Sequence, residues 1–164
     1  MSDVQQQRGT TQDPLDVLIV GAGLSGIDTA YRLRERNPGL NYRIVERRNR
    51  IGGTWDLFRY PGVRSDSDIF TLSFPWNPWR GKRTVAQGDE IRDYLEQTAR
   101  DFGIYNHITF GVDVSGADFN SETDLWTVDV LVDGEPTVIV TRFLYMCTGY
   151  YRYEKGYRPE FPGE

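Results

Sequence analysis

Three glycines near the start of the chain have the spacing of a nucleotide-binding loop. Gly21, Gly23 and Gly26 form the pattern G-x-G-x-x-G within the stretch DVLIVGAGLSGIDTAYRL. The first glycine permits a tight turn, the second lets the backbone approach a pyrophosphate, and the third lets a helix pack closely on a strand. Free amide groups at the start of that helix attract phosphate. The pattern predicts a dinucleotide site, although a glycine turn that only packs has the same spacing.

A glutamate stands where such a site needs an acid. Glu46 follows Gly26 by twenty residues and ends the apolar stretch YRIVE, which predicts a second buried strand. An acid at this point accepts hydrogen bonds from ribose hydroxyl groups and disfavours a 2′-phosphate. A solvated glutamate at a strand end is the alternative interpretation. If the acid binds ribose, NADP is disfavoured in this first site, and FAD and NAD remain.

The elements that would position these residues follow from the hydrophobic pattern. The apolar run 15–20, the helical spacing of 29–37 and the strand 42–46 predict a βαβ unit. Residues 47–88 are rich in Gly, Pro and Trp and predict a long functional loop, in which we expect PWNPW to anchor the loop. Residues 89–103 predict an amphipathic helix.

The last third of the chain alternates apolar and polar residues. The segments 107–119, 125–132 and 136–141 predict a three-stranded antiparallel meander, and 143–149 predicts one more apolar strand. The expected fold is therefore α/β: a Rossmann-like, three-layer fold with a parallel sheet and an antiparallel meander. We expect residues 1–14 to be a disordered tail and residues 15–164 to form one domain.

Composition excludes several classes of protein. The chain has 164 residues and a net charge of −5, and its Lys and Arg residues are scattered, so we expect no nucleic-acid partner. One cysteine, Cys147, allows no intramolecular disulfide, and the polar N-terminus is unlike a signal peptide. No apolar run approaches the roughly 20 residues that span a bilayer. These features predict a cytoplasmic protein without an integral membrane segment, and they predict no metal site.

Three motifs in order resemble one enzyme family. GAGLSG, then Glu46 followed by GGTW, then RYPGVRSDSD, is similar to class B flavin-dependent monooxygenases of the Baeyer–Villiger branch, near the ethionamide-activating monooxygenases. The resemblance extends from about Asp16 to the last residue. It implies FAD in this first fold, NADPH in a second one, and oxygen insertion into ketones or oxidation at sulfur.

The resemblance also implies roles for particular residues. Those implied to bind FAD are Gly21, Gly23, Ser25, Gly26, Glu46, Gly53, Thr54, Trp55 and Val114. Arg64 and Ser65 stand where family members contact NADPH. Asp66 matches the catalytic acid beside the flavin, which in the family orients an active-site arginine.

Two features of the family do not occur in these residues. No second G-x-G-x-x-G follows the first, and the family fingerprint F-x-G-x-x-x-H-x-x-x-W is absent. We therefore expect the N-terminal, FAD-binding part of such an enzyme, not competent for turnover alone. Two alternatives stay open: a cofactor-binding module completed by a missing half in trans, and a non-binding remnant that serves only association.

Overall fold

Six strands form one mixed sheet in the computed structural model, which describes residues 9–151, 153 and 155–163. The strands are β1 (Leu15–Val20), β2 (Tyr42–Glu46), β3 (Ile108–Phe110), β4 (Val112–Asn120), β5 (Leu125–Val132) and β6 (Glu135–Met146). The helices are α1 (Leu24–Arg36), α2 (Thr54–Leu57), α3 (Ile69–Leu72), α4 (Gly88–Asp101) and the 3-10 turn η1 (Tyr105–His107). The strand order is β3-β2-β1-β6-β5-β4.

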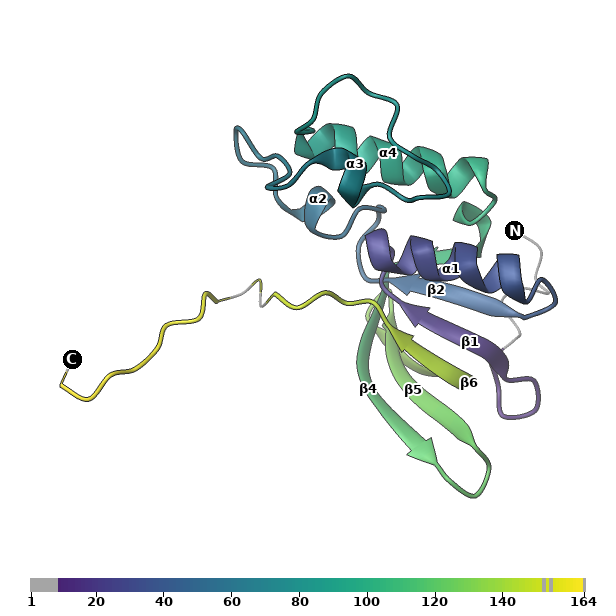
Figure 1. Ribbon diagram of the computed structural model, residues 1–164. Helices are drawn as coiled ribbons and strands as arrows, with labels where there is room; N and C mark the ends of the chain where they lie inside the picture. The colour runs from purple at the N-terminus through teal and green to yellow at the C-terminus, as the bar shows by residue number, and fades with distance from the viewer. Residues whose placement is uncertain (1–8, 152, 154, 164) are drawn as a thin grey trace.

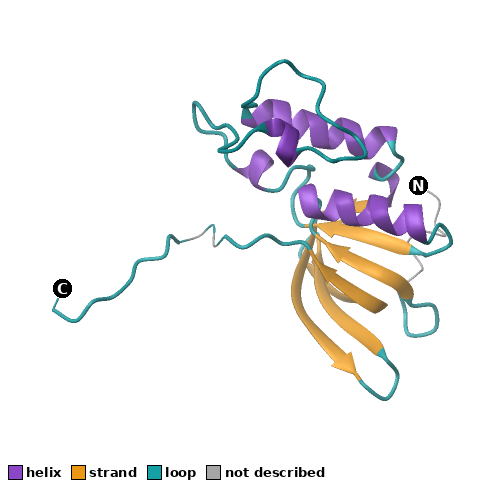
Figure 2. Ribbon diagram, viewed as in Figure 1, coloured by secondary structure: helices purple, strands orange, loops and turns teal. Residues whose placement is uncertain are grey.

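The first half of the sheet is parallel. β1 pairs with β2 on one side and with β6 on the other, and β3 extends the sheet beyond β2. α1 lies over this half, and α2, α3 and α4 lie beyond it on the same side (Figures 1 and 2). The arrangement confirms the predicted βαβ unit. An apolar run such as LDVLIV suits a strand that is buried on both faces.

The meander differs in detail from its prediction. The expected strand 107–119 is two strands, because the chain turns at Gly111, where φ is 72°. β3 pairs in parallel with β2, whereas β4 pairs antiparallel with β5. Conversely, the two strands expected at 136–141 and 143–149 are the single strand β6, which leaves β5 and joins β1 at Thr141. Arg142, between the two expected segments, lies within β6, where its side chain is exposed and pairs with Asp16 at 3.7 Å.

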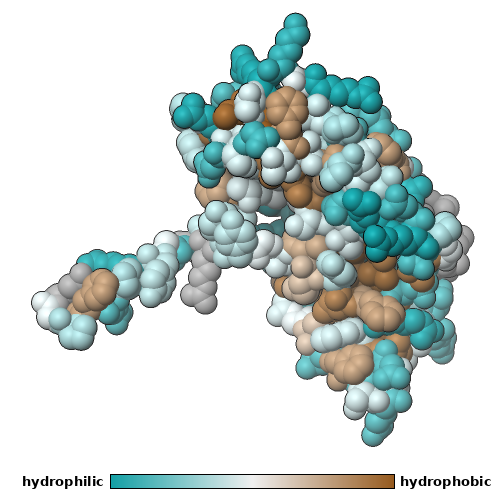
Figure 3. Space-filling model, viewed as in Figure 1, coloured by the Kyte–Doolittle hydropathy of each residue, from teal (hydrophilic) through white to brown (hydrophobic). Residues whose placement is uncertain are grey.

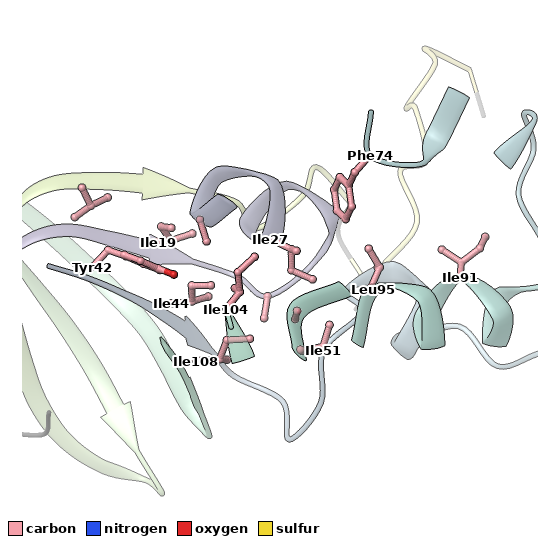
Figure 4. Packing of buried hydrophobic residues seen from close by; sticks show 14 of the residues in the cluster. Ile19, Ile27, Tyr42, Ile44, Ile51, Phe74, Ile91, Leu95, Ile104 and Ile108 are labelled. Atoms are coloured by element: carbon pink, nitrogen blue, oxygen red, sulfur yellow. The ribbon is translucent and has the colours of Figure 1, made fainter. Parts of the chain in front are cut away.

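Two hydrophobic clusters lie on either side of the parallel strands. Val17 and Ile19 of β1 belong to the cluster shared with α1 and α4 (Figure 4), whereas Leu18 and Val20 belong to the cluster shared with the meander. Alternate side chains of one strand therefore hold both neighbouring layers. The result is helices, parallel sheet and meander in three layers, which confirms the predicted fold class.

The two ends of the chain meet the sheet differently. Residues 1–8 of the predicted tail lie outside the described residues. Gly9, however, already contacts the sheet, since its N–H donates to the carbonyl of Asp13 at 2.8 Å and its carbonyl accepts from Val140 at 2.7 Å. After β6 the chain runs away from the sheet (Figure 1). Within the described ranges, no helix is long and apolar enough to cross a membrane.

Candidate functional site

A cleft of about 470 Å³ opens at the carboxyl ends of the parallel strands. The ends of β1, β2 and β6 lie at the same edge of the sheet (Figure 1). The cleft is lined by the β1–α1 loop, the β2–α2 loop, the start of β4 and the segment after β6. In an open α/β sheet, ligands bind outside the carboxyl ends of the strands. The cleft therefore occupies the expected position of a ligand site.

The start of α1 points its amide groups at this cleft without any cap. Its N-cap residue is Gly23, and among the described residues no side chain caps the helix and no acidic residue occupies its first turn. The first intrahelical hydrogen bond runs from the amide of Ile27 to the carbonyl of Gly23 at 3.1 Å. The amides before Ile27 are the free donors that a helix N-terminus offers to an anion.

The glycines of the first motif have different structural roles. A Cβ atom at Gly26 would lie 2.0 Å from the carbonyl oxygen of Gly21, so only glycine allows this contact between helix and turn. A Cβ atom at Gly23 would meet nothing closer than the Cα of Gly53, at 3.5 Å. Gly26 therefore serves packing, while Gly23 leaves a backbone surface open beside the cleft.

The second glycine pair lies against the first motif. The amide of Gly52 donates to the carbonyl of Ala22 at 3.1 Å, and a Cβ atom at Gly53 would lie 3.2 Å from the Cα of Gly23. α2 begins at the next residue, Thr54, and Trp55 lines the cleft while packing against the core. The two glycine segments, far apart in sequence, thus form one wall of the cleft.

Glu46 ties β2 to the glycine loop. Its side chain is 5% exposed. One carboxylate oxygen accepts from the amide of Ala22 at 2.8 Å, and the other accepts from the amide of Arg48 at 3.0 Å. These bonds satisfy a buried charge and hold it at the cleft, where each oxygen keeps a further lone pair for a hydroxyl donor.

Most of the predicted site residues meet at the cleft. Those that line it are Gly21, Gly23, Ser25, Glu46, Gly53, Thr54, Trp55 and Val114. Gly26 lies beneath the loop, as described above. Arg64, Ser65 and Asp66 lie outside the lining.

The residues outside the lining hold a different position. Ser65 is buried, and its amide and hydroxyl both bond to the backbone of Ala86, at 2.9 and 3.2 Å. Asp66 is exposed. The pKa of Tyr151 is raised mainly by its hydrogen bond with Tyr150, with a smaller contribution from the negative charge of Asp66.

Sequence reasoning missed the wall that follows β6. The amide of Cys147 donates to the carbonyl of Val20 at 2.8 Å, which brings the next residues beside the glycine loop. This wall consists of Cys147, Thr148, Gly149, Tyr150, Tyr151 and Tyr153. The signal was available, because a third parallel strand must end at the same edge as β1. Burial raises the pKa of the Cys147 thiol, which does not favour a nucleophilic thiolate.

Comparisons with known proteins agree with this geometry. Residues 19–80 match the family model of the NAD(P)-binding Rossmann-like domain. The chain is 51% identical over 148 residues to the FAD-containing monooxygenase EthA of Mycolicibacterium smegmatis. It is 48% identical over 150 residues to the putative FAD-containing monooxygenase MymA of Mycobacterium tuberculosis. Each match covers 90% of this chain and 30% of the relative.

Solved structures of monooxygenases are also similar to this chain. An oxidized steroid monooxygenase bound to NADP matches with a TM-score of 0.78 and 32% identity, covering 92% of this chain and 28% of that one. OTEMO in complex with FAD and NADP matches with a TM-score of 0.75 and 28% identity, covering 91% and 28%. The chain thus spans about 30% of the length of the relatives that it matches. In sequence it is similar to the N-terminal part of FAD-containing monooxygenases, and its structural neighbours are of the Baeyer–Villiger type.

Proposed function

We propose that this chain is the FAD-binding part of an NADPH-dependent flavoprotein monooxygenase. The observation that carries the proposal is the meeting of three features in one cleft: the uncapped start of α1, the buried carboxylate of Glu46 and the GGTW turn. Each feature suits one part of a dinucleotide, and the relatives described above are named for the FAD that they contain.

The order of residues along the cleft suits FAD from end to end. Glu46 and Val114 would take the adenosine, with the carboxylate accepting from the ribose hydroxyls. The backbone around Gly21, Gly23 and Ser25 would take the pyrophosphate, where the open side of Gly23 leaves room for close approach. Gly26 supports this loop from below by letting α1 pack on the turn.

The flavin end of the cleft is built around the second glycine pair. Gly53 and Thr54 would lie along the ring system, and Trp55 offers it a large apolar neighbour that the core holds in place. Bound FAD would supply the electron transfer and the reaction with oxygen. The residues of this chain would bind and orient it.

Glu46 also favours FAD over NADPH in this first site. A 2′-phosphate would bring negative charge beside a buried carboxylate, and such like charges repel strongly where water does not screen them. We assign NADPH to a second nucleotide-binding fold of the complete enzyme. Arg64 and Ser65 of this chain would contact that NADPH, and Asp66 would act as the catalytic acid that orients an arginine. The substrates of the complete enzyme are ketones or sulfur-containing compounds.

Titration with each nucleotide tests the proposal. FAD, NAD and NADPH are added in turn to the apo-chain while tryptophan fluorescence is followed. We expect FAD to bind tightest and to quench fluorescence largely through Trp55, so that Trp55→Phe loses most of the quenching, whereas Trp126→Phe, at a tryptophan outside the cleft, keeps it. Tighter binding of NADPH than of FAD would refute the assignment.

We also propose that these 164 residues do not catalyse turnover by themselves. Hydride transfer needs the nicotinamide held against the flavin, and such positioning contributes about 7–11 kcal/mol to catalysis. Incubation of the FAD-loaded chain with NADPH, oxygen and a simple ketone should give no ester. Ester formation coupled to NADPH loss would show that the chain, alone or as an oligomer, builds a complete active site.

A further inference from the structure

Arg48 carries two buried donor groups that the fold does not use. It follows Glu46 in the β2–α2 loop and lines the cleft, and its side chain is 23% exposed. Its Nε and Nη1 atoms are buried, yet neither makes a hydrogen bond with the residues that the structure describes. A buried N–H group without an acceptor is unfavourable, and such groups in native proteins call for an explanation.

The carboxylate of Glu46 explains only part of this arrangement. The Nε atom of Arg48 lies 3.5 Å from a carboxylate oxygen of Glu46, which makes an ion pair without a hydrogen bond. The same oxygen already accepts from the amide of Arg48 at 3.0 Å. Glu46 thus places the guanidinium group at the cleft and leaves its N–H groups for another acceptor.

Two comparisons set Arg48 apart. Arg47, the next residue along the chain, also lines the cleft, but it is exposed to solvent and needs no partner. Among the described side chains, the other buried donors without a partner are Tyr42 Oη and Trp79 Nε1, and neither lines the cleft. Unused buried donors and the proposed nucleotide cleft therefore coincide at Arg48.

We infer that Arg48 binds the diphosphate of the dinucleotide from the side opposite the start of α1. This inference rests on the proposed FAD site. A diphosphate carries about two negative charges, and Glu46 adds another beside it, while the helix start supplies only partial positive charge. The guanidinium group offsets this excess and offers planar, always charged donors that suit phosphate oxygens. Arg48 is thus a specificity residue for a nucleoside diphosphate.

Calorimetric titration of the full chain with FAD and with ADP tests the inference. Arg48→Met should weaken both ligands by the same factor, about tenfold or more, because both contain the diphosphate. Arg48→Lys, which keeps the charge but not the planar donors, should lose less. Arg47→Met removes the same charge from an exposed neighbour and should change both affinities less than threefold. Circular dichroism and thermal unfolding show which variants are folded.

The remaining outcomes decide against the inference in different ways. Unchanged binding of FAD and ADP by Arg48→Met would overturn it, as would equal losses in Arg47→Met and Arg48→Met. If Arg48→Met weakened NADP more than FAD, the residue would serve a 2′-phosphate instead. If the folded wild-type chain bound neither FAD nor ADP, the proposed function would fail first and this inference with it. Should Arg48→Met not fold, the Arg48→Lys titration decides by the same criteria.

Discussion

The two long helices of this molecule differ most at their first turns. α4 is closed by a capping box, in which the Gln87 side chain accepts from the amide of Glu90 and the Glu90 side chain accepts from the amide of Gln87 at 2.9 Å. Asp89 and Glu90 place negative charge at its positive end. α1 has a glycine N-cap, no capping side chain and no acid in its first turn. The fold gives the backbone amides at the start of α4 partners within the protein, and it leaves those at the start of α1 for a ligand.

Packing does not account for this difference. α1 and α4 have 13 and 14 residues, and each buries apolar residues against the same core, among them Ile27 in α1 and Ile91 and Leu95 in α4. A side-chain cap in place of an N-cap glycine typically adds about a few tenths of a kcal/mol to stability. α1 forgoes that contribution at the place where the glycine loop, Glu46 and the GGTW turn meet.

The largest effect should come from the glycine on which α1 packs. Gly26→Ala would place a Cβ atom 2.0 Å from the carbonyl oxygen of Gly21, so the helix and the turn must separate. We expect a loss of about 3 kcal/mol in the free energy of unfolding, measured by chemical denaturation. Gly39→Ala is the matched control, because a Cβ atom there meets nothing within 4 Å. Equal stability of the two variants would contradict the packing role of Gly26.

The next effect separates binding from stability at the helix cap. Gly23→Ala adds a methyl group on the open side of the loop, where the nearest protein atom is the Cα of Gly53 at 3.5 Å. The free energy of unfolding should change by less than about 1 kcal/mol. The affinity for FAD should fall at least about tenfold, because the methyl group keeps the pyrophosphate from the backbone. Unaltered affinity in fluorescence titration would remove Gly23 from the site.

The smallest effect should have opposite signs for stability and for binding. Ser25→Asp gives α1 the kind of acid that α4 already has, which should raise the free energy of unfolding by about 0.3–1 kcal/mol. The same charge should repel the pyrophosphate and weaken FAD binding severalfold. Ser25→Asn controls for shape without charge.

A counterpart in α4 completes this test. Glu90→Ala opens the capping box and should cost about 1 kcal/mol of stability while leaving the FAD affinity unchanged. If Ser25→Asp strengthened FAD binding, or if Glu90→Ala weakened it, the contrast between the two helix starts would be wrong.

The sequence was most informative for elements that a local pattern of residues determines. The apolar runs 15–20 and 42–46 predicted the first two strands at their observed bounds, with Glu46 at the end of the second. The helix expected at 29–37 begins earlier, at Leu24, and ends at Arg36. The long loop is likewise anchored through its PWNPW motif: Trp76 stacks on Tyr31 with ring centroids 3.7 Å apart and donates to Asp28 at 2.7 Å.

Prediction failed where distant segments decide the structure. The sequence predicted separate strands at 136–141 and 143–149, yet β6 continues through Arg142, since it pairs with β5 at its start and with β1 at its end. The cleft wall after β6 and the unused donors of Arg48 depend on which strands lie side by side. Exposed apolar residues also gather over the strands (Figure 3), among them Phe143 and Tyr145 of β6, at 68% and 54% exposure. Both residues lie in the segment 143–149, for which the sequence predicted only an apolar strand.

Purification of the chain after expression in a flavin-containing host is the most direct test of the central claim. The desalted protein should be yellow, its absorbance spectrum should be that of a bound flavin, and the flavin released by denaturation should be FAD, at close to one per chain. Gly23→Ala, purified in parallel, should be folded by circular dichroism and should carry much less FAD. A folded, colourless wild-type chain that also fails to bind added FAD would contradict the account.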